Sequence, residues 1–237
     1  TGDTGIELQF MDQDVVINTG LGNDVIRFED GNNTINVGGG DNLIVSARGT
    51  GDNIVTTGDG DNYIRLGKGS NEVYSGEGND KVYLIGGVDT SSVVETGNGD
   101  DFVLVKAGEL DLDVGAGNDT VKYLGREDVT LYGRDGDDTI VSGHGSDIIY
   151  GNAGNDRLNG GNGDDIIYGG SGNDIIKDIK GNNYVEAGFG DDKITLGGGN
   201  DIVSGGDGSD YINVSRGVDT VHFEYNETGT DTIVGFQ

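Results

Sequence analysis

The chain has 237 residues, with 14 basic and 43 acidic side chains and a formal net charge of −29. This charge argues against direct binding to nucleic acid or to an anionic membrane, and it predicts self-repulsion unless cations are bound. Glycine supplies 48 residues while proline and cysteine are absent, which argues against collagen, a proline-rich linker or a disulfide scaffold. No apolar run approaches the length of a transmembrane segment.

The first residues, TGDTGIELQF, do not resemble a signal peptide. We therefore expect a mature product, a fragment, or export by a route that needs no N-terminal signal. A nine-residue pattern begins at Thr19–Arg27, which reads TGLGNDVIR. Its glycines permit a turn with φ > 0, its sixth residue is Asp, and its apolar eighth residue points to one face of a strand. Each unit thus predicts a cation-binding turn followed by one short strand.

The next units of the pattern carry Asn instead of Asp at the sixth place, at Asn33, Asn42, Asn53, Asn62 and Asn71. Stacked Asn side chains can hydrogen-bond from turn to turn without a metal. Nearby carboxylates at Asp41, Asp59 and Asp61 also permit weak cation sites. Both hypotheses remain open for this segment.

Asp returns at the sixth place in three later units, at Asp80, Asp101 and Asp119, whereas Leu110 stands where another Asp is expected. Extra residues interrupt the period near 46–47, 91–93 and 126–132, and they predict bulges or widened turns. We assign residues 1–132 to a degenerate part of the repeat.

Residues 133–222 form ten consecutive units without an insertion, and their centre reads GHGSDIIY, GNAGNDRLN, GGNGDDIIY, GGSGNDIIK. The eighth place is always Ile, Leu or Val. A period this short predicts an all-β solenoid with a narrow core and no helix. The pattern ends in the aromatic segment FEYNETGTDTIVGFQ, so we expect residues 223–237 to cap the open end of the stack.

The unit GGxGxDxUx resembles the nonapeptide of the repeats-in-toxin (RTX) family, over residues 19–222 and strictly over 133–222. The resemblance implies a right-handed parallel β-roll with two short strands per 18-residue turn and several Ca²⁺ ions in the turns. It also implies passage of the unfolded chain through a type I secretion apparatus, and a secreted or cell-surface location in bacteria. Calcium prefers carboxylate and carbonyl oxygens, which these turns supply.

The resemblance further implies that each ion lies between stacked turns. The lower turn gives the carbonyls of its second and fourth residues and its Asp, and the upper turn gives those of its first and third residues and its Asp. One such site would use the carbonyls of Asn152, Gly154, Gly169 and Ser171 with Asp156 and Asp174. A site on the other edge would use the carbonyls of Gly143, Gly145, Gly160 and Asn162 with Asp147 and Asp165.

Successive units then alternate between two edges of the roll. The first edge carries Asp138, Asp156, Asp174, Asp192 and Asp210, extended by Asp119, Asp101 and Asp80 if the upstream insertions preserve the alternation. The second edge carries Asp147, Asp165, Asn183, Asp201 and Asp219. Because Asn183 brings no charge, we predict weaker or empty sites beside it and unequal calcium occupancy of the two edges. Equal, complete ladders in a crystallographic ion count would contradict this.

No HExxH, GxSxG or P-loop motif is present, so we expect no enzyme. The leading hypothesis is a calcium-binding module of a larger secreted toxin or adhesin that folds after secretion. The alternative is an accessory domain of a secreted hydrolase or a surface-layer protein. An outward stripe of one sheet is apolar and aromatic: Ile148, Tyr150, Ile166, Tyr168, Tyr184 and Ile202. It is either a docking face for a protein partner around Tyr150 and Tyr168 or a consequence of β-propensity.

Overall fold

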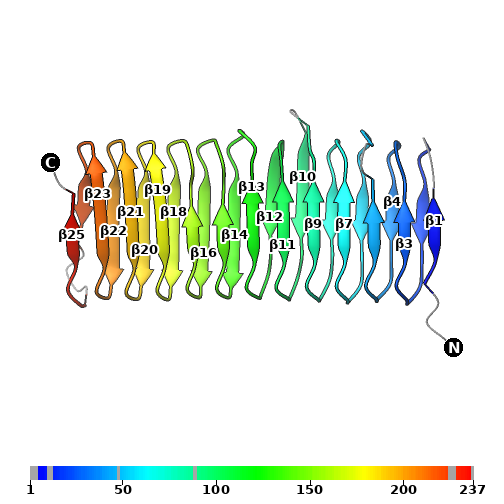
Figure 1. Ribbon diagram of the computed structural model, residues 1–237, viewed down its shortest axis with the longest axis horizontal. Coiled ribbons are helices and arrows are strands. Elements are labelled where there is room, and N and C mark those ends of the chain that lie inside the picture. The colour runs from blue at the N-terminus through cyan, green and yellow to red at the C-terminus, as the bar shows by residue number, and fades with distance from the viewer. Residues whose placement is uncertain (1–4, 10–12, 47–48, 88–89, 224–227, 236–237) are drawn as a thin grey trace. The chain divides into compact units, whose positions relative to one another are not determined.

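The computed structural model describes residues 5–9, 13–46, 49–87, 90–223 and 228–235. The chain divides into two compact units, Thr1–Ala116 and Gly117–Gln237. Each unit is a parallel β-solenoid whose strands alternate between two sheets (Figure 1). The predicted all-β parallel solenoid is therefore confirmed, and the described part of the chain holds no helix that could cross a membrane. The boundary expected at 132/133 rests on the regularity of the repeat and stays a prediction.

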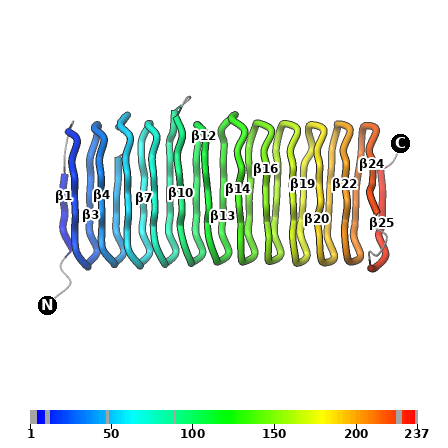
Figure 2. The backbone as a smooth tube through the Cα atoms, turned by 180° about the vertical axis from the view of Figure 1, so that it is seen from behind, coloured from blue at the N-terminus to red at the C-terminus, as the bar shows by residue number. Residues whose placement is uncertain are grey.

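In the unit Thr1–Ala116 every turn contributes one strand to each sheet. The odd-numbered strands are β1 (Glu7–Gln9), β3 (Val25–Arg27), β5 (Leu43–Val45), β7 (Tyr63–Leu66), β9 (Lys81–Leu84) and β11 (Phe102–Val105). The even-numbered strands are β2 (Val16–Asn18), β4 (Thr34–Asn36), β6 (Ile54–Thr56), β8 (Glu72–Tyr74), β10 (Ser91–Glu95) and β12 (Glu109–Asp113). The chain bends at two edges to pass from one sheet to the other (Figure 2).

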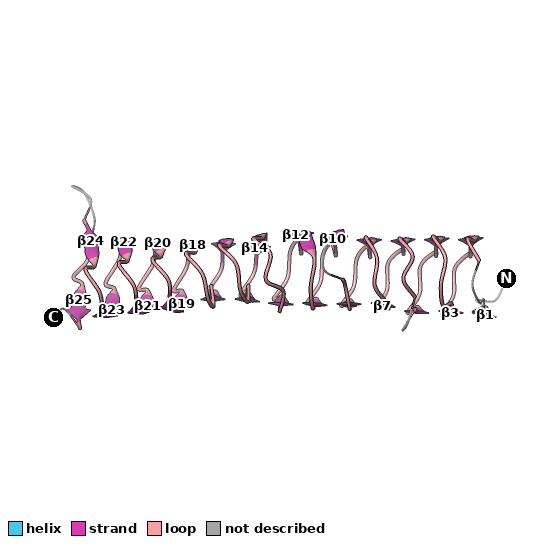
Figure 3. Cartoon of the chain, turned by 90° about the horizontal axis from the view of Figure 1, so that it is seen from above, coloured by secondary structure: helices cyan, strands magenta, loops and turns pink. Residues whose placement is uncertain are grey.

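The unit Gly117–Gln237 repeats this arrangement, and many of its strands are six residues long. Its odd-numbered strands are β13 (Thr120–Tyr123), β15 (Thr139–Val141), β17 (Arg157–Asn159), β19 (Ile175–Lys180), β21 (Lys193–Gly198), β23 (Tyr211–Arg216) and β25 (Thr232–Val234). Its even-numbered strands are β14 (Thr130–Asp135), β16 (Ile148–Ala153), β18 (Ile166–Ser171), β20 (Tyr184–Phe189), β22 (Ile202–Asp207) and β24 (Thr220–His222). Seen from above, the strands of each unit lie in two separate layers (Figure 3).

The core consists of the eighth residues of the units, stacked in register. Ile149 of β16 pairs with Ile167 of β18, which pairs with Val185 of β20, and all three side chains are fully buried. Burial of such a side chain contributes about 1.5–3 kcal/mol. Among the eighth residues from Ile26 to Val221, Val221 itself, near the C-terminal end of the pattern, is the one that is partly exposed in the described part of the chain.

Two of the predicted interruptions lie beside complete strands of the repeat. Residues 91–93 belong to β10, where Val94 is fully buried, and residues 126–132 lead into β14, where Leu131 is fully buried. Extra residues are present as predicted, because Val73 pairs with Val94, 21 residues on, and Val121 pairs with Ile140, 19 residues on, where regular units are 18 apart. They precede these two strands, whose sixth residues, Ser92 and Val129, hide the motif. Of the third interruption, Ser46 lies in a loop after β5, and Ala47 lies outside the described residues.

The C-terminal segment adds one strand to the stack. β25 pairs in parallel with β23, so that Ile233 lies beside Ile212. Residues 224–227 and 236–237 of the expected cap lie outside the described residues. The capping role stays a prediction.

Candidate metal sites in the turns

The turns direct their backbone carbonyls alternately toward the two neighbouring turns. In the turn 169–174 the second and fourth residues, Gly170 and Gly172, have φ of 114° and 122°. The N–H of Gly154 donates to the carbonyl of Ser171 at 2.8 Å, so this third-position carbonyl points to the preceding turn. A Cβ added at Gly170 would meet the carbonyl oxygen of Asn152, which therefore points to the following turn. The carbonyls implied by the family resemblance thus face one layer, meaning the space between two stacked turns.

The sixth-position carboxylates line these layers in a continuous ladder. The N–H of Asp156 donates to Oδ1 of Asp174 at 2.8 Å. The same bond joins the predicted first-edge residues in order: Asp119, Asp138, Asp156, Asp174, Asp192 and Asp210. It also joins the second-edge residues Asp147, Asp165, Asn183, Asp201 and Asp219. In the N-terminal unit the N–H of Asp80 donates to Asp101 in the same way, at 2.7 Å.

On the first edge one oxygen of each of four carboxylates is left over. Oδ1 accepts the ladder bond, whereas the buried Oδ2 has no hydrogen-bond donor in Asp138, Asp156, Asp174 and Asp192. A Cβ added at Gly151 would meet Oδ2 of Asp156 and would lie 2.6 Å from the carbonyl oxygen of Gly169. These two oxygens, one from a carboxylate and one from a carbonyl, therefore border the space over the first-position glycine. We call this space the cradle. Oxygen ligands of this kind fit Ca²⁺.

Burial makes these carboxylates hard to ionise without a nearby cation. It raises the pKa of Asp138 to about 8, and it raises the pKa of Asp174 and of Asp192 to about 7. The pKa of Asp156 is raised to about 6 for the same reason. A buried carboxylate is stable as an ion only when it is paired or bound to a metal. The carboxylates of the first edge are therefore more stable as ions with a bound cation than without one.

The first position of each turn decides whether its cradle is open, and the sequence interpretation overlooked it. On the first edge this position is small: Gly133, Gly151, Gly169, Ala187 and Gly205. On the second edge it is Ser142, Gly160, Asp178, Leu196 and Val214. Leu196 and Val214 are 1% and 0% exposed, so their side chains fill the interior beside Asp201 and Asp219.

The second-edge site predicted around Asp147 and Asp165 is partly satisfied by a side chain. The hydroxyl of Ser142 donates to the carbonyl of Gly160 at 2.6 Å, which engages one of the predicted ligands. The remaining carbonyls face the expected layer, since Gly143 accepts from the N–H of Asn162 at 3.0 Å and Gly145 donates to the carbonyl of Asn162 at 3.1 Å. The second edge thus differs from the first in more than Asn183.

Hydroxyl groups fill the corresponding space in part of the N-terminal unit. Thr57 donates to the carbonyl of Ser75 at 2.7 Å, Ser75 to that of Thr96 at 3.3 Å, and Thr96 to that of Val114 at 2.9 Å. Asp80 and Asp101 are the sixth residues of the turns that begin at Ser75 and Thr96. Their assignment as calcium ligands stays a prediction, and these turns already hold their first-position carbonyls by hydrogen bonds.

The Asn residues of the N-terminal unit form the ladder that a metal-free solenoid requires. The side-chain amide of Asn33 donates to Oδ1 of Asn53 at 2.8 Å, and that of Asn53 donates to Oδ1 of Asn71 at 2.9 Å. On the opposite edge Asn42 donates to Asn62 at 2.8 Å. Each of these bonds satisfies an amide donor and a buried acceptor without a cation. The geometry favours the metal-free hypothesis for these turns.

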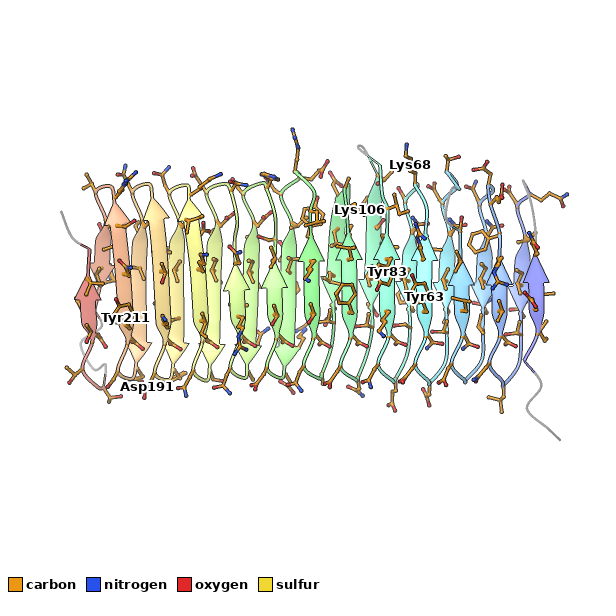
Figure 4. All side chains as sticks on the ribbon, viewed as in Figure 1. Tyr63, Lys68, Tyr83, Lys106, Asp191 and Tyr211 are labelled. Atoms are coloured by element: carbon orange, nitrogen blue, oxygen red, sulfur yellow. The ribbon has the colours of Figure 1, made fainter. Side chains whose placement is uncertain are left out.

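Fifth-position residues make a second ladder that the sequence interpretation did not foresee. Asp137 is exposed and accepts from the N–H of Asn155 at 2.7 Å, in the opposite chain direction to the buried ladder. Asp191 accepts in the same way from the N–H of Ser209 at 2.8 Å, and it lies at the turn edge in Figure 4. Adjacent carboxylates such as Asp137 and Asp138 therefore have separate roles, one on the surface and one inside.

The tyrosine stripe is an ordered stack on the even-numbered sheet. Tyr132, Tyr150 and Tyr168 stack at centroid distances of 5.0 Å, with ring planes within 5° and 8° of parallel. Tyr184 is tilted, and it lies in register with Ile166 because Tyr168 pairs with Glu186. Tyrosines also lie on other sheet faces, such as Tyr63 and Tyr83 in the N-terminal unit and Tyr211 in the C-terminal unit (Figure 4). A docking role stays a prediction.

In the described part of the chain, no group of three or more His, Cys, Asp and Glu side chains is placed to hold a metal by itself. Each first-edge layer instead combines two carboxylates with backbone carbonyls, so the fold is a solenoid whose turns offer oxygen ligands of the kind that cations bind. A comparison with protein families matches residues 16–44, 48–82, 123–149, 143–176 and 180–212 to the RTX calcium-binding nonapeptide repeat (4 copies). Because these segments cover more than half of the chain, it belongs to this family. No curated protein matched the chain.

Proposed function

We propose that this chain is a module that binds several calcium ions and folds when it does so. The observation that carries the proposal is the set of buried first-edge Oδ2 atoms without a donor in Asp138, Asp156, Asp174 and Asp192. Each faces a layer that also receives backbone carbonyls. When bound there, Ca²⁺ would supply positive charge to two carboxylates at once.

The charge of the chain supports a role for calcium in folding. Stacked carboxylates are about 5 Å apart, the spacing of neighbouring strands. Two unit charges at that distance repel by about 3 kcal/mol at an effective dielectric constant near 20. Without cations, the ladder and the net charge of −29 oppose the folded state. With calcium, the binding free energy becomes folding free energy.

The occupied sites would concentrate on the first edge of the unit Gly117–Gln237. That edge has small residues at the first position and an unbroken series of buried carboxylates. In the N-terminal unit, amide and hydroxyl hydrogen bonds replace many of the contacts that an ion would make. The N-terminal unit would therefore depend less on calcium.

We further propose that the module belongs to a larger secreted or cell-surface bacterial protein, a toxin or adhesin, and that it is itself not an enzyme. Membership of the RTX repeat family supports an extracellular setting, where calcium is abundant. A chain that stays unfolded at low calcium can pass through a type I secretion apparatus and fold outside. The stacked tyrosines support a docking face for a protein partner. A catalytic motif in a flanking segment would instead identify an accessory domain of a hydrolase.

Calorimetric titration of the full chain with Ca²⁺ tests the proposed function. We expect several ions per chain, with Mg²⁺ failing to compete at equal concentration because it demands a smaller, more rigid octahedral site. A chain that binds no calcium up to 10 mM, roughly tenfold above the weakest dissociation constants of extracellular calcium modules, would refute the proposal.

A further inference from the structure

Asp178 is a buried carboxylate outside the sixth-position ladder. It is the first residue of its unit, where the first edge has Gly or Ala. Its side chain is 0% exposed and lies at the inner face of β19. The N–H of Lys180 donates to Oδ1 at 3.3 Å, whereas Oδ2 has no donor.

The free oxygen of Asp178 points into the cradle of the preceding turn. A Cβ added at Gly160 would meet Oδ2 of Asp178 and Oδ2 of Asp165, so both oxygens border the same small space. The Oδ2 of Asp165 also lacks a donor and is buried. The two carboxyl groups also lie within hydrogen-bonding contact of each other. Two buried carboxylates without a counter-charge need a shared proton or a cation.

This layer is one of the two beside Asn183 that lack a sixth-position charge. Its upper turn carries Asn183, whose Oδ1 accepts the ladder bond from the N–H of Asp165 at 3.0 Å. In the first-edge layer between Asp156 and Asp174, two sixth-position carboxylates are present. The layer over Gly160 also has two carboxylates, but the second is Asp178 instead of a sixth-position Asp.

We propose that Asp165 and Asp178, over Gly160, form a variant calcium site in which Asp178 replaces the charge lost at Asn183. The inference rests on the proposed function, since it assumes that other layers bind calcium. The inference changes where the series of calcium ions on the second edge is interrupted. The layer between Asp165 and Asn183 binds an ion, and the layers without an ion begin beside Leu196 and Val214.

The test compares calcium stoichiometry in the full chain by calorimetry and locates the ions by anomalous diffraction. We expect Asp178→Asn to bind one ion fewer than the natural sequence and to lose the anomalous peak over Gly160. The matched control Asp164→Asn removes an exposed charge from the same turn and should leave the ion count unchanged. The double variant Asp178→Gly with Asn183→Asp returns the charge to the sixth position and should restore the lost ion.

An unchanged ion count in Asp178→Asn would overturn the inference, as would the absence of an ion over Gly160 in the natural sequence. Either outcome would mean that Asp165 and Asp178 share a proton instead of an ion. In that case the calcium-free form of Asp178→Asn should be more stable than that of the natural sequence. If the natural sequence binds no calcium at all, the proposed function fails as well. The crystallographic position in the natural sequence decides the matter even if a variant does not fold.

Discussion

The Asn ladder of the N-terminal unit makes a sharp prediction at Asn53. Its side-chain amide donates to the carbonyl of Gly51 at 2.8 Å and to Oδ1 of Asn71 at 2.9 Å. Substitution by Asp keeps Oδ1, which accepts from Asn33, but replaces the donor by a second acceptor. One buried and one partly buried acceptor then lose their donor, at about 1–3 kcal/mol each, so we expect Asn53→Asp to cost about 4 kcal/mol.

Amide hydrogen exchange in the calcium-loaded full chain measures this loss locally. A local destabilisation of 4 kcal/mol corresponds to a roughly thousandfold fall in protection for the amides of β4, β6 and β8. The control Asn32→Asp makes the same change one turn earlier at an exposed position, where Oδ1 still accepts from the N–H of Asp52 at 2.8 Å. The control should keep natural protection. If Asn53→Asp also keeps it, amide bonds do not hold these turns together and the reasoning is wrong.

Three further predictions concern the C-terminal unit. Asp156→Asn should weaken calcium binding at least about tenfold because it removes charge from two layers, whereas the exposed Asp137→Asn should not; calorimetry that finds equal effects would contradict the ladder. Calcium affinity should fall as the pH drops from 8 to 6, because burial raises the pKa of Asp138 to about 8 and calcium must displace the proton. Calorimetry in buffers of different ionisation enthalpy tests this, and a binding enthalpy that is the same in all of them would exclude the proton release. Changing Tyr150 and Tyr168 together to Ser should reduce concentration-dependent association in sedimentation, and no change there or in partner binding would end the docking hypothesis.

The period of the sequence was sufficient to predict the solenoid and its core. The apolar eighth residues, such as Ile149 and Ile167, are buried in register as expected. The period failed where a substitution hid the sixth residue. Ser92 and Val129 stand where Asp is expected, so the strands β10 and β14 were missed beside the extra residues that precede them. A strand needs only its alternating apolar residues, and those were present at Val94 and Leu131.

The candidate sites were less predictable because the sixth residue is only half of each cradle. The first residue decides how much space and which oxygen the layer offers, and in sequence it resembles ordinary variation at a turn. Ser142 binds a carbonyl that calcium would otherwise share, and Leu196 fills the interior. Asp178 adds a carboxylate where the pattern has none. The first and sixth residues taken together distinguish the turns with an open cradle from those in which a side chain occupies it.

The central claim is that calcium neutralises the carboxylate layers and thereby folds the C-terminal part of the chain. Far-UV circular dichroism of the full chain in EDTA, followed by addition of millimolar calcium, tests it most directly. We predict a spectrum with a large coil contribution in EDTA and a β spectrum after calcium is added. Hydrogen exchange followed in parallel should show that the amides of residues 133–222 become protected when calcium is added. A spectrum that is the same in EDTA and in calcium would contradict the account.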